Sequence, residues 1–312
     1  MKKLVVSSSP HITSPLTTRR VMLDVIIALL PAVVAGAVIF GPRALAVLAV
    51  TVSVAVISEF LFNFITKRSQ TVDDLSAIVT GLLLGLNLRA DAPLWQCAIG
   101  SVFAIIVVKC LFGGLGCNFA NPAITARIFL LISFTGTIGG GAIPHFSNSP
   151  ELVSGATPLD VIGTSSDLPS ILDMLLGLRG GAIGETCAIA LILGFIYLVV
   201  RKIINFEIPL IFVGTVFILS LAVDASLSVA LYQILSGGLI LGAVFMATDY
   251  VTTPITRSGK MIFAFGCGLI TFLIRYFGTY PEGVSFSILI MNILSPYIEK
   301  WTMSRPLGGK KA

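Results

Sequence analysis

The pattern of hydrophobic positions predicts a chain built of successive membrane-spanning α-helices. Apolar runs of about 20 residues, the length that a helix needs to cross the hydrocarbon, follow one another from Val21 to Met303. Segments such as 44–57 and 188–200 are apolar on every side, whereas the strands of a membrane β-barrel would alternate polar and apolar residues. We therefore expect an all-α polytopic membrane protein of about ten transmembrane helices, near residues 21–40, 44–65, 74–88, 94–112, 121–140, 181–200, 207–223, 227–247, 260–277 and 284–303.

A repeated glycine motif divides these spans into two halves. Gly81-Leu-Leu-Leu-Gly85 matches Gly238-Leu-Ile-Leu-Gly242, and an acid, Asp91 or Asp249, follows each copy. Two five-helix halves would be inverted relative to each other, because an odd number of spans reverses the direction of the chain in the membrane. The alternative is that Gly-xxx-Gly recurs only because it lets helices pack closely. The predicted division is an amino-terminal segment (1–20), a first five-helix repeat (21–140), a loop (141–180), a second five-helix repeat (181–303) and a tail (304–312).

Composition and charge support this interpretation and orient it. Hydrophobic residues make up 56% of the chain and charged residues only 11%, too few for a soluble domain. The net charge of +5 does not indicate nucleic-acid binding, because the lysines and arginines outside the spans gather on the side of the two termini. Both termini should therefore be cytoplasmic and the loop 141–180 extracytoplasmic, with Arg179 as its one base. No cleaved signal peptide is expected at the amino terminus.

Charged residues in or beside spans are the first candidates for function, because burying charge in lipid is costly. Glu59, Lys109 and Asp249 lie deepest and are the functional candidates. Those closer to the span ends, among them Asp24 and Arg127, are expected to anchor the helices at the interface. The five scattered cysteines predict neither a disulfide framework nor a metal site, although Cys110 and Cys117 could join a cluster shared with another subunit.

Two Gly/Pro-rich breaks, at residues 113–123 and 247–260, fall at membrane depth, where irregular backbone must be buried in protein or line a cavity. The sequence Asn121-Pro122-Ala123 is typical of a water channel. A single match of three residues carries little weight, however, and a helix start, with Asn121 as the cap and Pro122 at the first helical position, explains it without function.

The predicted loop carries the sequence Glu151-Leu-Val-Ser154-Gly155-Ala156-Thr157-Pro158. Small residues leave the backbone around Thr157 uncovered, and Pro158 favours an extended conformation there. No histidine adjoins Thr157 to activate its hydroxyl, so it cannot act as a nucleophile unaided. Taken alone, the segment is typical of a turn.

The chain as a whole resembles the D subunit of Rnf electron-transport complexes, a family related to the B subunit of the Na⁺-translocating NADH:quinone reductase. The resemblance covers nearly every span. It rests on Ser154-Gly-Ala-Thr157, which looks like the flavin-attachment signature, on the segment Phe112 to Ala123, and on Met246-Ala-Thr-Asp249-Tyr-Val-Thr-Thr-Pro254. Glu151 stands where the family usually has aspartate.

The resemblance implies a membrane-bound flavoprotein subunit of an ion-translocating ferredoxin:NAD oxidoreductase. A flavin transferase would join FMN to Thr157 through a phosphoester, with Ser154, Gly155 and Ala156 completing the site, and a second, non-covalent flavin such as riboflavin is allowed for. The chain has no dinucleotide loop or iron–sulfur cysteine set, so other Rnf subunits would handle ferredoxin and NAD. The competing hypothesis, from architecture alone, is a solute channel or transporter of urea-channel-like inverted-repeat fold.

Overall fold

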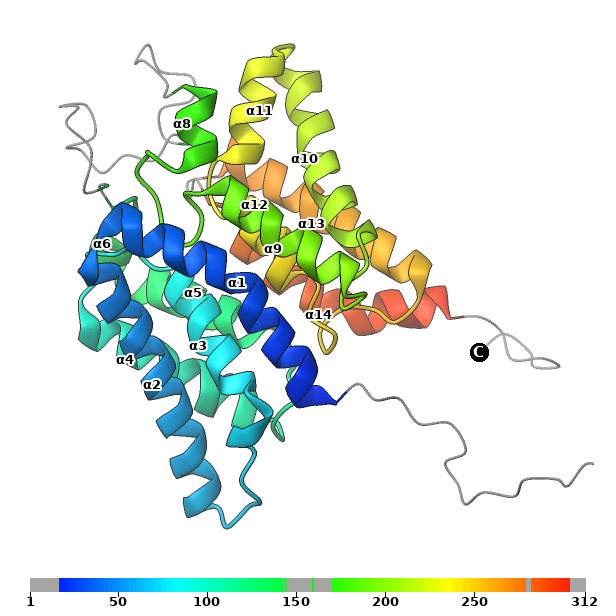
Figure 1. The fold of residues 1–312 in the computed structure, drawn as a ribbon. Coiled ribbons are helices and arrows are strands. Elements are labelled where there is room, and N and C mark those ends of the chain that lie inside the picture. Colours follow the sequence, from blue (N-terminus) through cyan, green and yellow to red (C-terminus); the bar gives the residue numbers. More distant parts are fainter. Residues whose placement is uncertain (1–16, 143, 145–158, 160–169, 279–281, 304–312) are drawn as a thin grey trace, which may run out of the picture.

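The computed structural model describes residues 17–142, 144, 159, 170–278 and 282–303, which form helices joined by short turns (Figure 1). Ala142 and Gly181 form an isolated antiparallel bridge. The prediction of an all-α polytopic membrane protein is confirmed, and a helix lies within every predicted span.

The first half contains α1 (Thr18–Phe40), α2 (Pro42–Ile65), η1 (Val72–Asp74), α3 (Ser76–Leu86), α4 (Leu94–Val102), the π-helical η2 (Phe103–Cys110), α5 (Pro122–Ser133) and α6 (Thr135–Ile138). The second half contains α9 (Ala188–Val200), α10 (Glu207–Asp224), α11 (Leu227–Leu235), α12 (Leu239–Leu241), the π-helical η4 (Gly242–Met246), α13 (Arg257–Phe277) and α14 (Val284–Thr302). The short helix α8 (Ile171–Leu176) precedes it.

Helix length separates the predicted spans into two kinds. Within the described ranges, α1, α2, α10 and α13 are the four helices long and apolar enough to cross a membrane, and α3, α4–η2, α5 and α9 are shorter apolar helices. The pair α11 and α12–η4 is a fifth candidate if counted as one broken span, bent by 62°. The span predicted over 227–247 is therefore broken near its middle. Gly237 allows the break, because its φ of +65° is rarely adopted by a residue with a Cβ.

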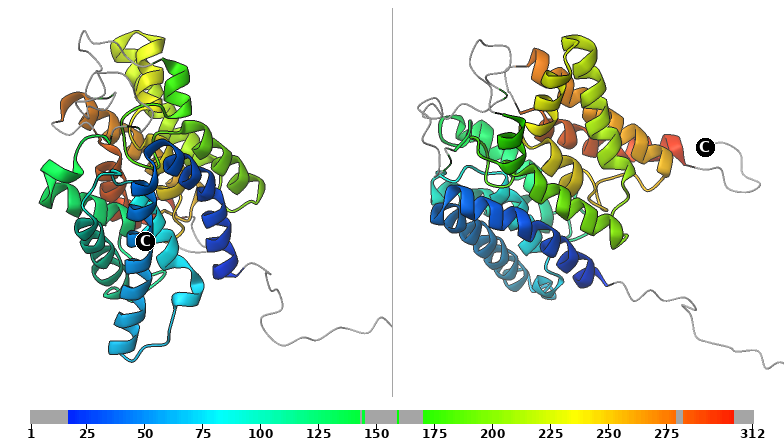
Figure 2. Two further views of the ribbon diagram at one scale, coloured as in Figure 1. Left: turned by 60° about the vertical axis from the view of Figure 1, so that its left-hand side comes forward. Right: turned by 45° about the horizontal axis from the view of Figure 1, so that its top comes forward.

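Helix contacts follow the same pattern in both halves. α2 packs against α3 and α4, and α10 packs against α11 and α13. Across the halves, α1 packs along α9 and α5 meets α14 (Figures 1 and 2). Small residues permit the α1–α9 contact, because a Cβ on Gly194 would collide with the carbonyl oxygen of Ala28. The two halves thus contact each other through α1 with α9 and through α5 with α14.

The repeated glycines are close-packing positions. A Cβ on Gly81 would lie 2.8 Å from Cα of Val52 on α2, and a Cβ on Gly242 would lie 2.5 Å from Cγ1 of Val284 on α14. The packing role considered for these glycines is therefore confirmed. The two glycines pack against different helices of their halves, Gly81 against α2 and Gly242 against α14.

The molecule has two ends that differ in charge and structure. At one end, here called the basic end, α1 begins and α9 and α14 end. Arg201 contacts Asp24 there at 3.1 Å, and Arg257 contacts Glu207 at 2.6 Å. At the opposite end, called the loop end, α10 turns into α11, and Ala142 donates to Gly181. Asp24 is buried within the protein at this end, and its carboxylate accepts hydrogen bonds from Arg201 and, at 2.9 Å, from Tyr197.

Candidate functional site

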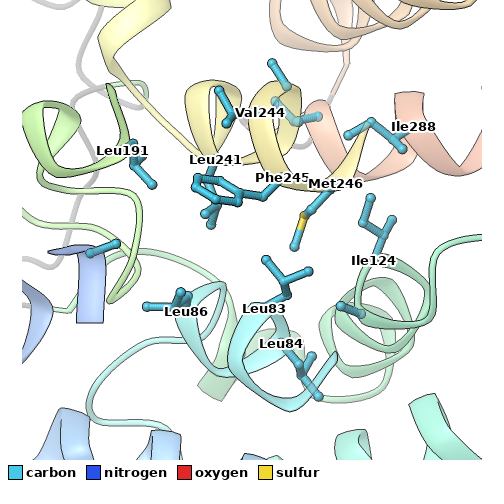
Figure 3. Close-up of a cluster of buried hydrophobic side chains, with 14 of the residues drawn as sticks. Leu83, Leu84, Leu86, Ile124, Leu191, Leu241, Val244, Phe245, Met246 and Ile288 are labelled. Carbon is cyan, nitrogen blue, oxygen red and sulfur yellow. The ribbon is translucent and has the colours of Figure 1, made fainter. Parts of the chain in front are cut away.

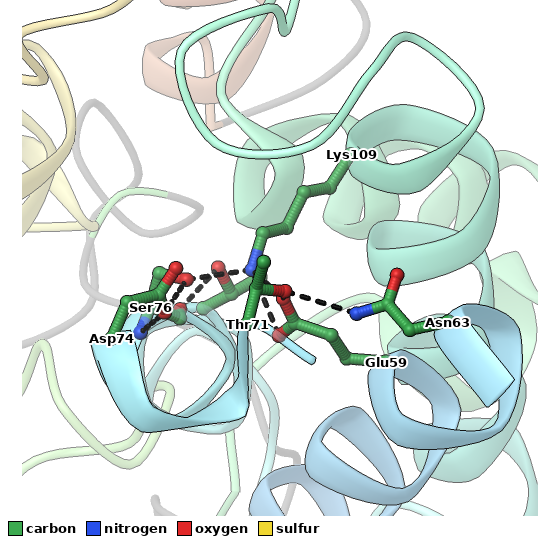
Figure 4. A network of polar contacts seen from close by, with 7 residues as sticks. Glu59, Asn63, Thr71, Asp74, Ser76 and Lys109 are labelled. Atoms are coloured by element: carbon green, nitrogen blue, oxygen red, sulfur yellow. Dashed lines mark hydrogen bonds and ion pairs between the residues drawn. The ribbon is translucent and has the colours of Figure 1, made fainter. Parts of the chain in front are cut away.

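A buried ion pair joins the two charged residues that the sequence placed deepest in the first half. Lys109 on η2 and Glu59 on α2 are 2% and 1% exposed. The Lys109 ammonium donates to both Glu59 carboxylate oxygens, at 2.8 and 2.9 Å, and to Ser76 Oγ at 2.6 Å (Figure 4). All three ammonium protons therefore have acceptors, as a charge in such a place requires.

The ion pair continues into a chain of hydrogen bonds that reaches the surface of the basic end. Thr71, which is exposed, donates to Glu59 at 2.6 Å and accepts from Asn63 at 3.0 Å. Asp74 accepts from the Ser76 backbone N–H at 2.8 Å and also from its hydroxyl. The network fixes the start of α3, because both the backbone and the side chain of its first residue are held.

A cavity of about 90 Å³ opens beside this network, between the two halves. Ser76 and Lys109 line it from the first half, and Phe245, Asp249 and Tyr250 line it from the second. Its walls also include apolar residues of α1, α3 and α9, such as Val25, Val79 and Leu198. Small-molecule sites in proteins have this composition, with mostly apolar walls and a few convergent polar groups.

Both Gly/Pro-rich breaks contribute to the cavity, as expected for irregular backbone at this depth. Asn118 and Asn121 come from the first break, and Asn118 Oδ1 is buried without a hydrogen-bond partner among the described residues. Gly113, Gly114 and Gly116 have φ values of +122°, +96° and +94°, which lets the loop that carries Leu115 and Asn118 turn over the cavity.

Asn121 has a local structural role as well as a place in the cavity wall. It caps α5 by accepting from the Ala123 and Ile124 N–H groups at 3.0 and 3.4 Å, which confirms the helix-start interpretation. It also donates to Met246 O at 3.4 Å. The same side chain therefore starts a helix in the first half and connects it to the second.

Asp249 holds the second break in place. Its carboxylate accepts from the Val251 N–H and from the Thr252 hydroxyl, both at 3.3 Å. Its backbone carbonyl accepts from the Thr253 hydroxyl at 2.7 Å. The residue that the sequence selected as a functional candidate thus orders the irregular segment that it belongs to, at the wall of the cavity.

Above the cavity, α3 and α12–η4 meet through apolar side chains. Leu83 and Leu86 approach from α3, and Val244, Phe245 and Met246 approach from η4 (Figure 3). All five are buried. This contact separates the cavity at the basic end from the polar groups at the loop end.

Two arginines hold the broken helix at the loop end. Arg179 donates to Glu185 O at 2.9 Å and to Leu235 O, and Arg275 donates to Gln233 O at 2.5 Å and Ser236 O at 3.1 Å. The acceptors at residues 233–236 are carbonyls at the end of α11, which have no partners within their own helix. Arg179 was expected in the polar outer loop, but it is 1% exposed. A broken span leaves carbonyls unpaired, and the guanidinium groups satisfy them.

A third buried arginine contradicts its sequence interpretation. Arg127 was expected to anchor at the interface, but it forms an ion pair with Glu282 and donates to Asn87 O. The sequence did not predict that Asn87, Arg179 and Glu185 lie close to buried arginines at this end. The one signal for such a site was Arg179 itself, a charged residue in a segment of small residues just before a span.

The four residues of the proposed attachment signature, Ser154, Gly155, Ala156 and Thr157, lie outside the described residues. Leu159, two positions after Thr157, is described. A Cβ on Gly237 would lie 3.6 Å from Leu159 Cδ1 and 3.0 Å from Arg275 Nη2. The chain just beyond the signature therefore lies at the loop end, beside the break in the α11–α12 span.

Comparison with known proteins gives consistent matches over the whole chain. Residues 5–308 match the model of the NQR2, RnfD, RnfE family. The chain is 46% identical to the D subunit of the Na⁺-translocating ferredoxin:NAD⁺ oxidoreductase complex of Acetobacterium woodii, over 99% of this chain and 96% of that protein. It is 39% identical to the D subunit of the proton-translocating ferredoxin:NAD⁺ oxidoreductase complex of Clostridium ljungdahlii, over 98% of this chain and 96% of that protein.

Proposed function

Because this chain belongs to the NQR2, RnfD, RnfE family, we propose that it is the D subunit of an Rnf-type complex, which couples electron transfer between ferredoxin and NAD to translocation of Na⁺ or H⁺. The observation that carries the proposal is the 46% identity to a relative of that name over 99% of this chain. The chain is one subunit of an oxidoreductase and works with the other Rnf subunits. Its place is the cell membrane, with the basic end cytoplasmic and the loop extracytoplasmic.

Deletion and return of the chain test this function. Membrane vesicles from cells that lack it are expected to lose nearly all ferredoxin-dependent NAD reduction, together with the coupled uptake of Na⁺ or H⁺, and a plasmid copy restores both. Since one missing carrier interrupts electron flow through the whole complex, the two losses should be equal. Normal NAD reduction by vesicles without the chain, with the other subunits present, would contradict the proposal.

The cofactor that we propose is FMN, joined to Thr157 through a phosphoester by a flavin transferase. The described residues nearby fit a phosphorylated group. The Arg275 guanidinium and Leu159 both lie beside Gly237, Arg179 binds the neighbouring end of α11, and the Nε atoms of both arginines are buried without partners in the described part of the chain. Two residues span at most about 7 Å, so a phosphoester on Thr157 would lie within the field of these cations. When bound, FMN supplies the electron-carrying ring, and the protein supplies position and charge.

For the second, non-covalent flavin we propose the cavity at the basic end. Phe245 and Tyr250 provide aromatic surface, and the unpartnered Asn118 Oδ1 is an acceptor suited to a ring N–H donor. The cavity of about 90 Å³ is smaller than a flavin ring. Entry would therefore displace Leu115, which is 36% exposed and sits on the glycine-rich loop.

Asn118→Leu tests this second site. The substitution removes the buried acceptor and fills part of the cavity, so the flavin that is released on denaturation should fall by more than half, while the covalently bound flavin stays constant. Acid extraction of the purified complex followed by chromatography measures the released flavin. Asn205→Leu, an exposed asparagine at the same end, serves as the control. An unchanged amount of released flavin would place the second flavin elsewhere.

The channel hypothesis is weaker on one structural ground. A solute path between the halves would pass from the cavity to the loop end, and the apolar side chains of Leu83, Leu86 and Phe245 fill that route (Figure 3). Solute flux by the chain reconstituted without partners would revive the hypothesis.

A further inference from the structure

A second cavity, of about 180 Å³, lies at the basic end beside the first. It forms between the turn that follows α9 and the segment that connects η4 to α13. Lys202 and Lys260 line it, together with the hydroxyl-bearing Thr253 and Tyr250 and the apolar Ile208. No acidic residue is among the described residues that line it.

The two lysines differ from three other cations of the basic end, each of which has a carboxylate partner. Arg201 is paired with Asp24, Arg257 with Glu207, and Lys109 with Glu59. Neither Lys202 nor Lys260 has a side-chain partner among the described residues. The cavity therefore holds two ammonium groups whose charge no carboxylate of the described chain balances.

Local backbone structure presents both lysines to the same space. Lys202 has φ of +56° and its N–H donates to Val199 O at 2.9 Å, so it sits in the turn that ends α9. Lys260 lies in the first turn of α13, whose cap is Thr256. The positive end of the α13 dipole adds to the field of the two ammonium groups.

Exposed apolar side chains lie close in the chain to the residues that line the cavity. Val200, Phe206 and Leu210, on or beside α9 and α10, are 73%, 53% and 58% exposed. Exposed apolar residues of this kind on a membrane-spanning chain face the acyl chains of lipid. The cavity thus contains two lysines, and exposed apolar side chains lie next to its lining residues in the chain.

We propose that this cavity binds the phosphate head group of an anionic phospholipid, with Lys202 and Lys260 as the phosphate ligands. Thr253 and Tyr250 offer further hydroxyl donors, and the acyl chains would lie against Val200 and Phe206. A free phosphate ion would gain nothing from the apolar surface, whereas a lipid uses both parts of the site. Basic pockets between transmembrane helices on the cytoplasmic side recognise anionic head groups in this way.

The test measures lipid binding to the purified, delipidated complex in detergent. Phosphatidylglycerol and phosphatidylcholine are the probes, and native mass spectrometry reports the bound lipid. Each lysine should contribute about fivefold to affinity, so Lys202→Gln with Lys260→Gln should weaken phosphatidylglycerol binding by about 25-fold. Binding of phosphatidylcholine should be weak and unchanged by the two substitutions.

Lys67→Gln is the matched control, since Lys67 is an exposed lysine at the end of a helix with a similar φ of +54° and lines neither of the two cavities described. It should bind phosphatidylglycerol like the wild type.

Equal affinity of the double variant and the wild type would overturn the proposal. So would equal binding of the two lipids, or complete displacement of phosphatidylglycerol by millimolar inorganic phosphate, which would identify a free-anion site. Because Lys202 is exposed, the single variant Lys202→Gln should fold normally, and its expected loss of about fivefold keeps the test decisive if the double variant does not fold.

Discussion

Thr157→Ala is expected to abolish the covalent flavin attachment that we propose for this chain, because alanine has no hydroxyl to form a phosphoester. After denaturing electrophoresis, the wild-type band should fluoresce and the variant band should be dark. The loss should be essentially complete, since the bond either forms or does not. Ferredoxin:NAD electron transfer by the assembled complex should fall by the same large factor if the loop flavin is an obligatory carrier.

Two variants control for indirect effects. Thr157→Ser keeps a hydroxyl and should retain a fluorescent band, while Asn118→Leu acts on the other proposed flavin site and should leave the band unchanged. Mass spectrometry of the loop peptide should detect the added mass of FMN in the wild type and not in Thr157→Ala. A fluorescent Thr157→Ala band would mean that the flavin is attached elsewhere, and unmodified wild-type protein made beside its transferase would refute covalent attachment.

Lys109→Met is expected to destabilise the protein by about 3–5 kcal/mol, the usual cost of removing one partner of a buried ion pair. Methionine fills a similar volume but leaves the Glu59 carboxylate, 1% exposed, without its counter-charge. The Thr71 hydroxyl alone would remain as a donor to it. Thermal or denaturant unfolding of the purified chain, monitored by size-exclusion chromatography, measures the change in stability.

The double variant Lys109→Met with Glu59→Gln separates charge burial from packing. The neutral amide costs less to bury than the carboxylate, so the double variant should be more stable than Lys109→Met alone. Lys67→Met, at an exposed position, should have little effect. If Lys109→Met were as stable as the wild type, the ion pair would not contribute to folding, and the two buried charges would need a functional explanation.

Much of the architecture was predictable because membrane burial acts on each segment separately. A run of apolar residues must form a helix in lipid, since nothing else satisfies its backbone, and each predicted span contains a helix. The cap at Asn121 was predictable for the same local reason, because an Asn-Pro pair suits a helix start. The break at Gly237 was not, since glycine within a span also serves close packing, as at Gly81.

The candidate sites show the same difference between local features, which the sequence predicts, and contacts between distant residues, which it does not. Sequence reasoning singled out Glu59 and Lys109 separately but could not pair them, because they lie 50 positions apart on different helices. It placed Arg179 in a loop. The role of Arg179 in capping the end of α11 could not be predicted, because the break in that span was not predicted. The assignment of Thr157 came from the resemblance of its motif, which requires no tertiary contact.

By itself, the sequence determined that the chain lies in a membrane, that it is helical, and which side of the spans carries most lysines and arginines. It also determined the segment proposed for the flavin. These properties depend on composition and short motifs. The tertiary structure alone decided which charges neutralise each other, which carbonyls the arginines satisfy, and where cavities remain between the halves. Those properties depend on distances between residues far apart in the chain. Helix packing sets such distances, and hydropathy contains no information about them.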